Sequence, residues 1–447
     1  MKKMSELIQK YNRPGPRYTS YPPVPFWSNR PSESEWICNL KTNYKDDVGV
    51  DLYVHVPFCE SLCYYCGCNR TITKNHEVES HYMASLLKEW NLYIEKLGFI
   101  PRVNSLHFGG GTPTFLSPQN LDQLMSVLLE NKSDAFIGSI EIDPRTCRDE
   151  HIQVLANHGI VRVSLGIQDF DPDVQKAINR DQTPQMVEEH VVKLRKSGII
   201  SLNFDLIYGL PKQSSASILK TIEIVARLKP DLIAFYSYAH LPERIKNQRL
   251  IVENDLPAPS LKRELYELGK KLLIENGYVD IGMDHFSLPS NFLYRAMKEK
   301  KLHRNFMGFV DKKSSLLIGL GPSSISDSSI SFVQNCKDVK NYQQKVMSNQ
   351  LPIESGHTQN KCDLLIQKTI LEMMCQGEFE LSETDEMPYW NEISKELNAF
   401  ADDGLIVREK NKIALTETGK IFVRNIAMIF DYHLREKSSS VKFSQTI

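Results

Sequence analysis

The stretch Asp51-Leu-Tyr-Val-His-Val-Pro-Phe-Cys59-Glu-Ser-Leu-Cys63-Tyr-Tyr-Cys66-Gly-Cys68 places four cysteines within ten residues, directly after a short apolar run. Residues 51–56 are rich in apolar and β-branched side chains, which predicts a β-strand. Thiolates this close together are soft ligands that favour an iron–sulfur cluster or zinc. The stretch therefore predicts a strand that ends in a metal-binding loop.

The spacing of the cysteines favours iron and sulfur over zinc. Zinc modules usually add a second pair of ligands a dozen or more residues away, and no second C-x2-C follows at that distance. The first three cysteines have the spacing C-x3-C-x2-C. Three cysteines in one short loop can hold three irons of a cubane and leave the fourth iron open for a ligand. A zinc knuckle and disulfides remain the alternatives.

Composition indicates a globular cytoplasmic protein. The chain has 447 residues, of which 41% are hydrophobic, and its 54 basic and 55 acidic residues give a net charge of −1. This balance argues against general nucleic-acid binding, which usually brings a basic excess. No segment approaches the roughly 18 apolar residues of a membrane span, and the first residues do not resemble a signal peptide. In the cytoplasm, nine cysteines indicate metal binding or reduced thiols.

From residue 50 onward, apolar β-rich runs alternate with amphipathic helical patterns. Six β-then-α units in succession predict an α/β fold with a parallel sheet curled towards a barrel, a partial (β/α)6 barrel. In such barrels the chemistry lies at the carboxyl ends of the strands. The runs are residues 51–56, 105–108, 139–142, 162–167, 201–207 and 232–237, and the helical patterns include 76–96, 118–130, 214–228 and 260–275.

The remaining segments divide the chain further. Residues 1–49, with their Pro- and Tyr-rich stretch, are predicted to form an extended N-terminal arm, followed by the barrel at 50–290 and a connecting segment at 291–355. Residues 356–447 are predicted to form a mostly helical, winged-helix-like C-terminal domain. Its expected elements are helices at 363–374, 392–403 and 417–430 and a hairpin of 405–409 with 412–415. We expect this domain to act as a structural unit or lid, because the chain is not basic.

Polar or glycine-rich residues follow each of the predicted strands. Three glycines in Gly109-Gly-Gly-Thr-Pro-Thr114 would let backbone approach a ligand closely. Such residues around one mouth predict a binding site. The other strand-end residues are Glu141 and Asp143, Gln168 and Asp169 with Arg180 further on, Asp205, and Ala239 with His240.

Together these motifs resemble a known family. C-x3-C-x2-C after the first strand, followed by Gly-Gly-Gly-Thr-Pro, is similar to the radical S-adenosylmethionine (SAM) enzymes. The chain further resembles the oxygen-independent coproporphyrinogen III oxidases of that superfamily over nearly its whole length. The motifs that carry this resemblance are Pro14-Gly-Pro-Arg-Tyr-Thr-Ser-Tyr-Pro22, Tyr53-Val-His-Val-Pro-Phe-Cys59, Gly67-Cys68-Asn69, Gly282-Met-Asp-His-Phe286 and Leu302-His-Arg-Asn-Phe306.

The resemblance implies roles for individual residues. Cys59, Cys63 and Cys66 would ligate one [4Fe–4S] cluster, and Cys68 would be needed for turnover without ligating it. The chain would bind one or two molecules of SAM. Contacts to the SAM on the open iron are expected from Tyr53, Tyr65, Gly110, Glu141 and Ile325, and contacts to the second from Gly111, Thr112, Gln168, Arg180, Asp205 and Ala239.

The reaction implied by the resemblance converts two propionates of coproporphyrinogen III to vinyl groups with loss of CO2, giving protoporphyrinogen IX. Breaking an unactivated C–H bond without oxygen requires cofactor chemistry. Because the substrate carries four carboxylates, arginine partners are expected, and the candidates are Arg17, His303 and Arg304. We expect a monomer that takes electrons from a donor such as a flavodoxin and that binds neither nucleic acid nor membrane.

Three other functions compete with this interpretation. A heme chaperone would share the same core, but such relatives usually carry Phe in place of Cys68 and tend to lack the Pro-Gly-Pro-Arg arm. A radical SAM methyltransferase or heme-degrading enzyme would also use two SAM sites. A transcription factor would use the winged-helix-like region, with DNA binding that weakens steeply with salt.

Overall fold

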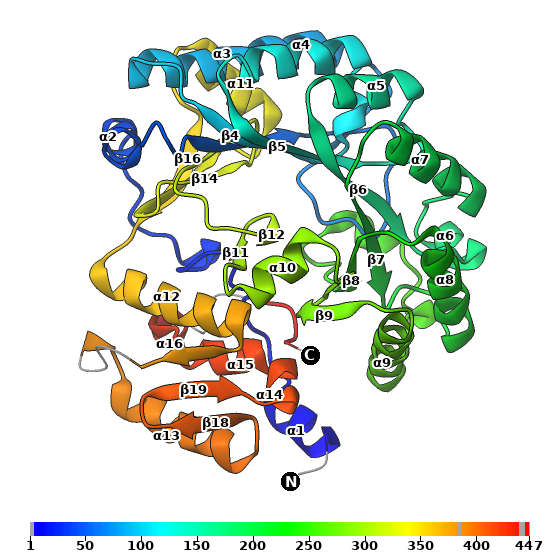
Figure 1. Ribbon diagram of the computed structural model, residues 1–447, viewed down its shortest axis with the longest axis vertical. Helices are drawn as coiled ribbons and strands as arrows, with labels where there is room; N and C mark the ends of the chain where they lie inside the picture. The colour runs from blue at the N-terminus through cyan, green and yellow to red at the C-terminus, as the bar shows by residue number, and fades with distance from the viewer. Residues whose placement is uncertain (1–3, 382–385, 438–442, 447) are drawn as a thin grey trace.

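A single curved sheet organises most of the chain (Figure 1). The computed structural model describes residues 4–381, 386–437 and 443–446. Within these residues the sheet has twelve strands. In spatial order they are β16 (Ile353–Thr358), β15 (Ser331–Asn335), β14 (Ile325–Asp327), β13 (Leu317–Leu320), β1 (Val50–Val56), β4 (Val103–Gly110), β5 (Lys132–Ile142), β6 (Ile160–Gln168), β7 (Ser201–Tyr208), β8 (Leu232–Ser237), β10 (His285–Ser287) and β9 (Val279–Gly282).

The parallel part of the sheet confirms the predicted fold class. Strands β1, β4, β5, β6, β7 and β8 pair in parallel in sequence order, and each overlaps one of the six predicted strands. A seventh strand, β13, pairs in parallel with β1 on its other side. This strand comes from the predicted connecting segment 291–355, which also supplies β14 and β15.

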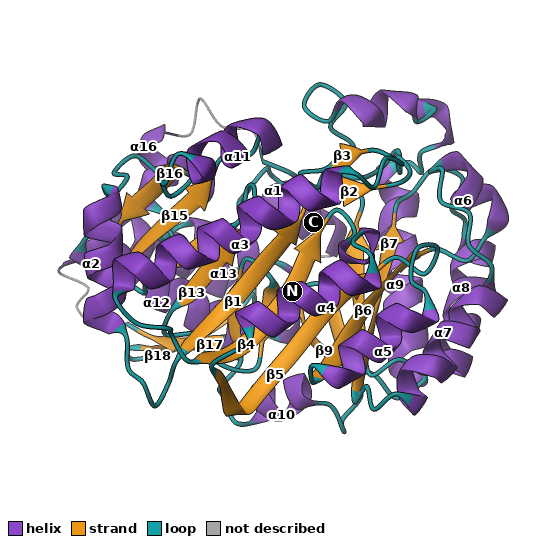
Figure 2. Ribbon diagram, turned by 90° about the horizontal axis from the view of Figure 1, so that it is seen from above, coloured by secondary structure: helices purple, strands orange, loops and turns teal. Residues whose placement is uncertain are grey.

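Helices cover the outer face of the parallel strands, as the view from above shows (Figure 2). Two of them, α4 and α7, begin with Pro at the first position after a Ser or Thr cap, Ser117 and Thr183. Such a cap satisfies backbone N–H groups that the helix leaves open. The covering helices are α3 (Val78–Leu97), α4 (Pro118–Leu128), α5 (Asp149–Asn157), α6 (Pro172–Ala177), α7 (Pro184–Lys196), α8 (Ser215–Leu228), α9 (Pro259–Glu275) and α11 (Val339–Met347).

The N-terminal arm is only partly extended, so the expectation of an extended segment is corrected. It contains α1 (Met4–Tyr11) and α2 (Glu33–Asn43), joined by an irregular stretch. Amphipathic burial explains both helices: α1 buries Leu7 and Tyr11 against the C-terminal region, and α2 buries Trp36 against the barrel core. Close to α1, Pro14 forms a β-bridge with Gln445, so the two ends of the chain lie side by side.

The C-terminal region has the predicted order of helix, helix, β-wing and helix, with two differences. The predicted helix 417–430 is present but divided in two, because Phe422 ends α14 with non-helical dihedral angles and α15 begins after it. The side chain of Phe422 is fully buried in the local core, which fixes this break. A short strand, β17, was not predicted. The elements are α12 (Lys361–Gln376), β17 (Glu378–Glu380), α13 (Trp390–Asp402), β18 (Ile406–Glu409), β19 (Lys412–Leu415), α14 (Glu417–Ile421), α15 (Val423–Met428) and α16 (Tyr432–Lys437).

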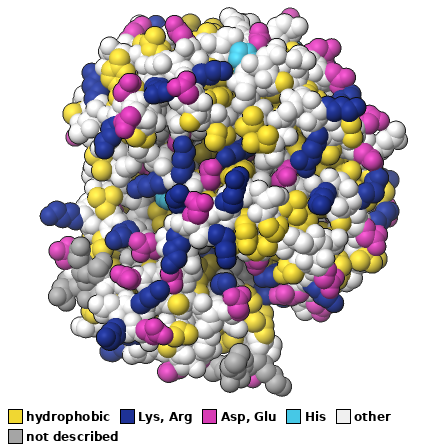
Figure 3. Space-filling model, in the orientation of Figure 1, with side chains coloured by type: hydrophobic (Ala, Val, Ile, Leu, Met, Phe, Trp, Pro, Cys, Tyr) yellow, Lys and Arg dark blue, Asp and Glu magenta, His cyan; other side chains and the backbone are white. Residues whose placement is uncertain are grey.

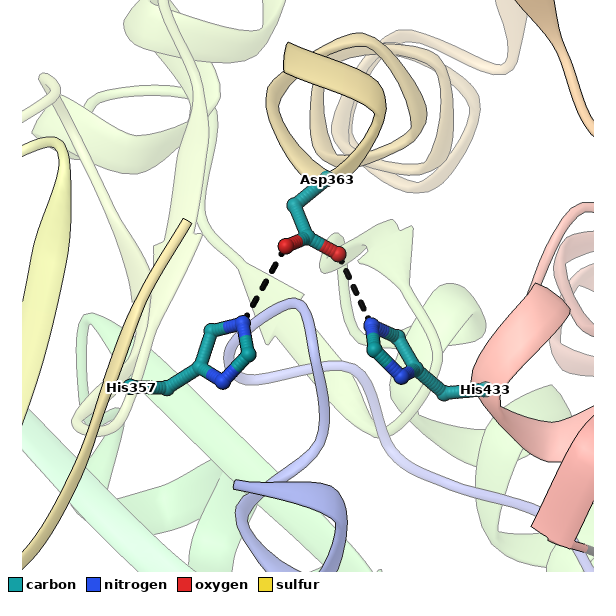
Figure 4. Close-up of side chains that lie close together, drawn as sticks. All are labelled: His357, Asp363 and His433. Atoms are coloured by element: carbon teal, nitrogen blue, oxygen red, sulfur yellow. Dashed lines mark hydrogen bonds and ion pairs between the residues drawn. The ribbon is translucent and has the colours of Figure 1, made fainter. Parts of the chain in front are cut away.

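A buried histidine–aspartate–histidine cluster joins the sheet to the C-terminal helices (Figure 4). Asp363 in α12 accepts hydrogen bonds from His357 of β16 at 3.1 Å and from His433 of α16 at 2.8 Å. Tyr432 Oη also donates to Asp363, at 2.8 Å. The two histidines and Asp363 are all buried. This cluster therefore connects three elements across the boundary between the sheet and the helical region.

The smaller elements and the surface complete the fold. A hairpin of β11 (His303–Asn305) and β12 (Gly308–Val310) and a short α10 (Phe292–Lys298) lie against the barrel (Figure 1). On the face shown in Figure 3, Lys and Arg side chains alternate with Asp and Glu, in keeping with the net charge of −1. No helix in the described part of the chain has the length and apolar character that crossing a membrane requires.

Candidate active site

A cavity of about 480 Å³ lies inside the parallel strands. Side chains of a strand alternate between its two faces, and here the apolar ones point outward to the helices. In β7, Leu202 and Phe204 are fully buried on the helical side, whereas Asn203 and Asp205 line the cavity. The same alternation recurs in β5, where Ser139 and Glu141 face inward. The strand pattern thus places polar side chains on the inner face of the sheet, around the cavity.

The cysteine loop closes one end of this cavity. The short strand β2 (Phe58–Cys59) pairs with β3 (Thr71–Ile72), and the loop between them carries the remaining cysteines. Figure 2 shows β2 and β3 beyond the carboxyl ends of β1 and β4. All four cysteines of the loop line the cavity. The structure therefore brings the thiols together at the strand ends, where the sequence predicts the site.

Two guanidinium groups lie against the thiol of Cys63. Arg180 Nη1 is 3.4 Å and Arg145 Nη2 is 3.6 Å from Cys63 Sγ. Both arginines also bind Asp143, at 3.1 and 2.7 Å. Although burial alone raises the pKa of Asp143, these arginines lower that pKa to about 2. The resulting cluster holds positive charge next to a thiol that ligation would make anionic.

The other thiols also have specific partners. Thr112 Oγ1 donates to Cys59 Sγ at 3.3 Å, but burial raises the pKa of Cys59 to about 11. A hydrogen bond from the Cys68 thiol is the main reason that the pKa of Cys66 falls to about 6. The Cys66 thiol is thus easier to deprotonate than an ordinary cysteine thiol.

The glycine loop after β4 packs tightly against the cysteine loop. A Cβ on Gly111 would lie 2.8 Å from the carbonyl oxygen of Phe58 and 3.0 Å from Cys59 Sγ, so a side chain has no space there. Gly110 has a φ of 118°, which favours glycine, and its N–H donates to Glu141 at 3.3 Å. The glycines therefore allow the backbone to approach the cysteines.

These features fit an iron–sulfur cluster ligated by thiolates. Three thiols in C-x3-C-x2-C spacing share one cavity wall, and two arginines lie beside Cys63. Thiolate ligands and nearby hydrogen-bond donors are the usual environment of such clusters.

The structure places most of the predicted SAM contacts on this cavity. One of these residues is Asp205, whose pKa is raised to about 6 by burial and, to a smaller extent, by the negative charge of Glu141. Another is Arg180, which donates a hydrogen bond to the Gly166 carbonyl. Three of the predicted contacts do not line it. Tyr53 of β1 stacks on His107 of β4, and Ile325 lies in β14. Ala239 lines a separate cavity of about 880 Å³. The predicted contacts that line the cavity are Tyr65, Gly110, Gly111, Thr112, Glu141, Gln168, Arg180 and Asp205.

None of the three candidate substrate residues lines the 480 Å³ cavity. Arg17 forms an ion pair with Asp284 at 3.0 Å and lines the larger cavity. His303 lies in β11, where burial lowers its pKa to about 4. Arg304 is 5% exposed, stacks 4.9 Å from the ring centre of Phe309, and donates to the Arg17 carbonyl at 3.3 Å. Its Nη1 is buried and has no hydrogen-bond partner among the described residues.

Sequence reasoning missed several residues of the site. Arg145 follows the predicted strand-end residue Asp143 by two positions, so the same strand-end signal was available for it. Asn247 and Gln248 donate to backbone carbonyls of the cysteine loop from a segment that carries no motif. Contacts of this kind depend on tertiary structure and have no local signal.

Comparison with known proteins identifies the family. The radical SAM superfamily profile matches residues 53–225. The oxygen-independent coproporphyrinogen III oxidase of Pseudomonas aeruginosa is 40% identical over 99% of this chain and 98% of its own length. The enzyme of that name from Escherichia coli (strain K12) is 37% identical over 99% of this chain and 98% of its own. The structure of coproporphyrinogen III oxidase (HemN) from Escherichia coli superposes with a TM-score of 0.90 and 34% identity, covering 96% of this chain and 99% of that one.

These relatives do not favour the heme-chaperone or methyltransferase alternatives. The chain belongs to the oxygen-independent coproporphyrinogen III oxidases, a family of radical SAM enzymes.

Proposed function

We propose that this protein oxidatively decarboxylates two propionates of coproporphyrinogen III to vinyl groups, giving protoporphyrinogen IX for heme biosynthesis. The observation that carries the proposal is the cysteine loop at the cavity inside the parallel strands, in a chain that matches oxidases of this name over nearly its full length. One [4Fe–4S] cluster and SAM are the cofactors.

The chain's own residues would hold the cluster and SAM in defined places. We propose Cys59, Cys63 and Cys66 as the three cluster ligands, with Arg145 and Arg180 stabilising the anionic Cys63. Together, the cluster and SAM supply the one-electron chemistry that an unactivated C–H bond requires. The glycine loop offers backbone groups without side chains, and Glu141 and Asp205 offer carboxylates to hydroxyl or amino groups of SAM.

Cys68 has a separate proposed role. Its thiol lies on the cavity wall, beside Cys66 and outside the C-x3-C-x2-C ligand set. We propose that Cys68 stays unligated and is required for turnover, with its proton held at Sγ.

The propionates need cationic partners, and the pair of Arg304 and Arg17 is our proposed anchor. A buried guanidinium without a carboxylate partner is costly, because its charge is removed from water without compensation. Arg304 is such a group, since within the described residues its guanidinium donates to the Arg17 carbonyl and stacks on the Phe309 ring but forms no ion pair. A substrate carboxylate would supply the missing partner. His303, on the same hairpin, is proposed as a neutral contact.

We further propose that the protein works as a cytoplasmic monomer without nucleic acid and receives electrons from a small donor such as a flavodoxin. Gly67 and Cys68 are exposed, which would leave the cysteine loop accessible to such a donor.

An anaerobic assay tests the proposed function. The protein is reconstituted with iron and sulfide and supplied with SAM, a strong reductant and coproporphyrinogen III. Porphyrins are then oxidised and separated by chromatography, and 5′-deoxyadenosine is measured. We expect protoporphyrin and 5′-deoxyadenosine from the wild type, no bound iron in Cys63→Ser, and bound iron without protoporphyrin in Cys68→Ser. Cys38→Ser changes an exposed cysteine outside the site and serves as the control.

Two results would contradict this proposal. 5′-Deoxyadenosine without protoporphyrin would place the substrate elsewhere. An intact cluster with no SAM cleavage would favour the chaperone alternative.

A further inference from the structure

The segment that follows β8 binds the backbone of the cysteine loop. This segment contains a short 3₁₀ helix, η3 (Lys246–Leu250). Asn247 Nδ2 lies 3.2 Å from the carbonyl oxygen of Cys63, 2.8 Å from that of Tyr64 and 3.0 Å from that of Cys66. One side-chain amide therefore donates hydrogen bonds to three carbonyls of a single loop, although about 180 residues separate Asn247 from that loop along the chain.

The neighbouring residue, Gln248, binds the remaining carbonyl of the loop, that of Tyr65. Gln248 is 1% exposed, and its Nε2 donates to the carbonyl oxygen of Tyr65 at 3.0 Å and to that of Ala239 at 3.1 Å. Its Oε1 accepts a hydrogen bond from the N–H of Leu241. Asn247 and Gln248 together bind every carbonyl from Cys63 to Cys66. Because Gln248 also binds the Ala239 carbonyl, it connects this loop to the segment that follows β8.

Binding these carbonyls also orients the N–H groups of the loop. In a planar trans peptide the C=O and N–H groups point in opposite directions. The N–H groups of Tyr65 and Gly67 belong to the peptides whose carbonyls face Asn247, so they point away from it. Within the described residues neither N–H donates to another protein group, whereas the N–H of Tyr64 donates to the Ile178 carbonyl. Two backbone donors are thus held without a protein partner next to the cysteines.

We propose that Asn247 is a positioning residue for the iron–sulfur cluster: by binding the carbonyls of Cys63, Tyr64 and Cys66, it directs the N–H groups of Tyr65 and Gly67 towards the cluster and raises its reduction potential. This inference rests on the proposed ligation by Cys59, Cys63 and Cys66. Hydrogen bonds to the sulfurs of a cluster stabilise its more negative, reduced state. Loss of the amide would leave three loop carbonyls to reorient and would weaken those bonds.

Two variants separate the hydrogen bonds from the packing. Asn247→Asp has the same shape but no N–H group, and Asn247→Ala removes the amide without adding charge. Lys246→Ala alters an exposed residue of the same 3₁₀ helix and is the matched control. The measurements, made on the full chain without substrate, are the cluster potential from an EPR-monitored titration and the rate of iron release to a chelator.

We expect the reduction potential of the cluster to be lower in both Asn247 variants than in Lys246→Ala. The expected shift is about 59 mV, which corresponds to a tenfold change in the one-electron equilibrium. We also expect iron release at least tenfold faster. Potentials and release rates equal to those of Lys246→Ala would overturn the role of Asn247 while leaving the proposed function standing. A wild-type protein that binds no iron would instead overturn the cluster ligation and this inference with it.

Discussion

Arg304 illustrates how a single residue can be retained for binding at the expense of stability. Its guanidinium is buried between the Phe309 ring and the Arg17 carbonyl, and burial followed by Arg17 lowers its pKa. Asp284 is a nearby carboxylate that raises this pKa, but it forms its ion pair with Arg17. Replacing a poorly compensated buried charge by an apolar side chain is often neutral or stabilising.

We therefore expect opposite effects of Arg304→Met on binding and stability. Losing a charge-assisted hydrogen bond of about 1.5–3 kcal/mol should raise the KM for coproporphyrinogen III roughly 10- to 100-fold. The Tm should stay the same or rise, and SAM cleavage in the absence of substrate should be unchanged. Steady-state kinetics and thermal unfolding under anaerobic conditions measure these quantities.

Arg227→Met is the control, because Arg227 forms an exposed ion pair with Glu188. An unchanged KM together with a lower Tm would assign Arg304 a structural role only.

Individual residues were predictable where the signal is local. The cysteines, the glycine loop and Asp205 lie next to predicted strand ends, and the structure brings them to one cavity. Asn247 was not predictable, because its three acceptors are distant in the sequence and an asparagine in a polar loop has no distinctive pattern. Arg304 was a candidate through family resemblance, but its burial and missing partner required coordinates.

At the scale of elements, the cluster of His357, Asp363 and His433 joins β16, α12 and α16 (Figure 4). The side chain of Asp363 is fully buried. Burial alone would raise its pKa, but hydrogen bonds from the two histidines, Asn360 and Tyr432 hold that pKa well below its usual range. A carboxyl whose folded-state pKa is depressed stabilises the fold above its unfolded pKa, and this contribution falls as the pH drops below that value.

Asp363→Asn should lower the free energy of unfolding by about 2–3 kcal/mol at pH 7, because charged hydrogen bonds are replaced by neutral ones. The difference from wild type should shrink below about pH 4, where the carboxyl of the unfolded chain becomes protonated. Denaturant unfolding followed by circular dichroism measures it.

Asp402→Asn removes an exposed carboxylate at the end of α13 and should cost little at any pH. If the difference in the free energy of unfolding between Asp363→Asn and wild type instead grows as the pH falls below about 4, the charged carboxylate does not stabilise the fold in this way.

Elements were predictable from periodicity when they were long and regular. Six of the seven parallel strands, β13 being the exception, follow from their apolar runs, and α9 and α12 follow from their amphipathic spacing. Residues 417–430 keep a helical pattern across Phe422, but packing of that ring interrupts the helix. Strands of three residues such as β17 are too short to show a period.

The whole molecule has separate hydrophobic cores. One lies between the parallel strands and their helices, and another lies among α12–α16 and includes Leu7 and Tyr11 of α1. Tyr11 Oη donates to Asp403 at 2.6 Å, and Lys10 Nζ lies 2.6 Å from the same carboxylate. The first helix of the chain is therefore part of the core formed by its last helices.

Deleting residues 1–12 should destabilise the C-terminal region by at least about 3 kcal/mol, since two large buried side chains are lost. Hydrogen exchange in α12–α15 should accelerate at least tenfold, while exchange in β1–β8 and the iron content should not change. Glu6→Ala, an exposed change in the same helix, is the control. Equal acceleration in β1–β8 would show that the two cores unfold as one unit.

The pairing of the chain ends has a consequence for synthesis. The strand-and-helix units of the barrel contact their neighbours in sequence and can pack as the ribosome extends the chain. Leu7 and Tyr11 emerge first, yet their partners in α15 and the bridge of Pro14 to Gln445 are the last to be made. The apolar face of α1 therefore remains exposed or transiently covered until α15 has been synthesised. Closing so long a loop is slow, so the growing chain should be most prone to aggregation before α15 packs on α1.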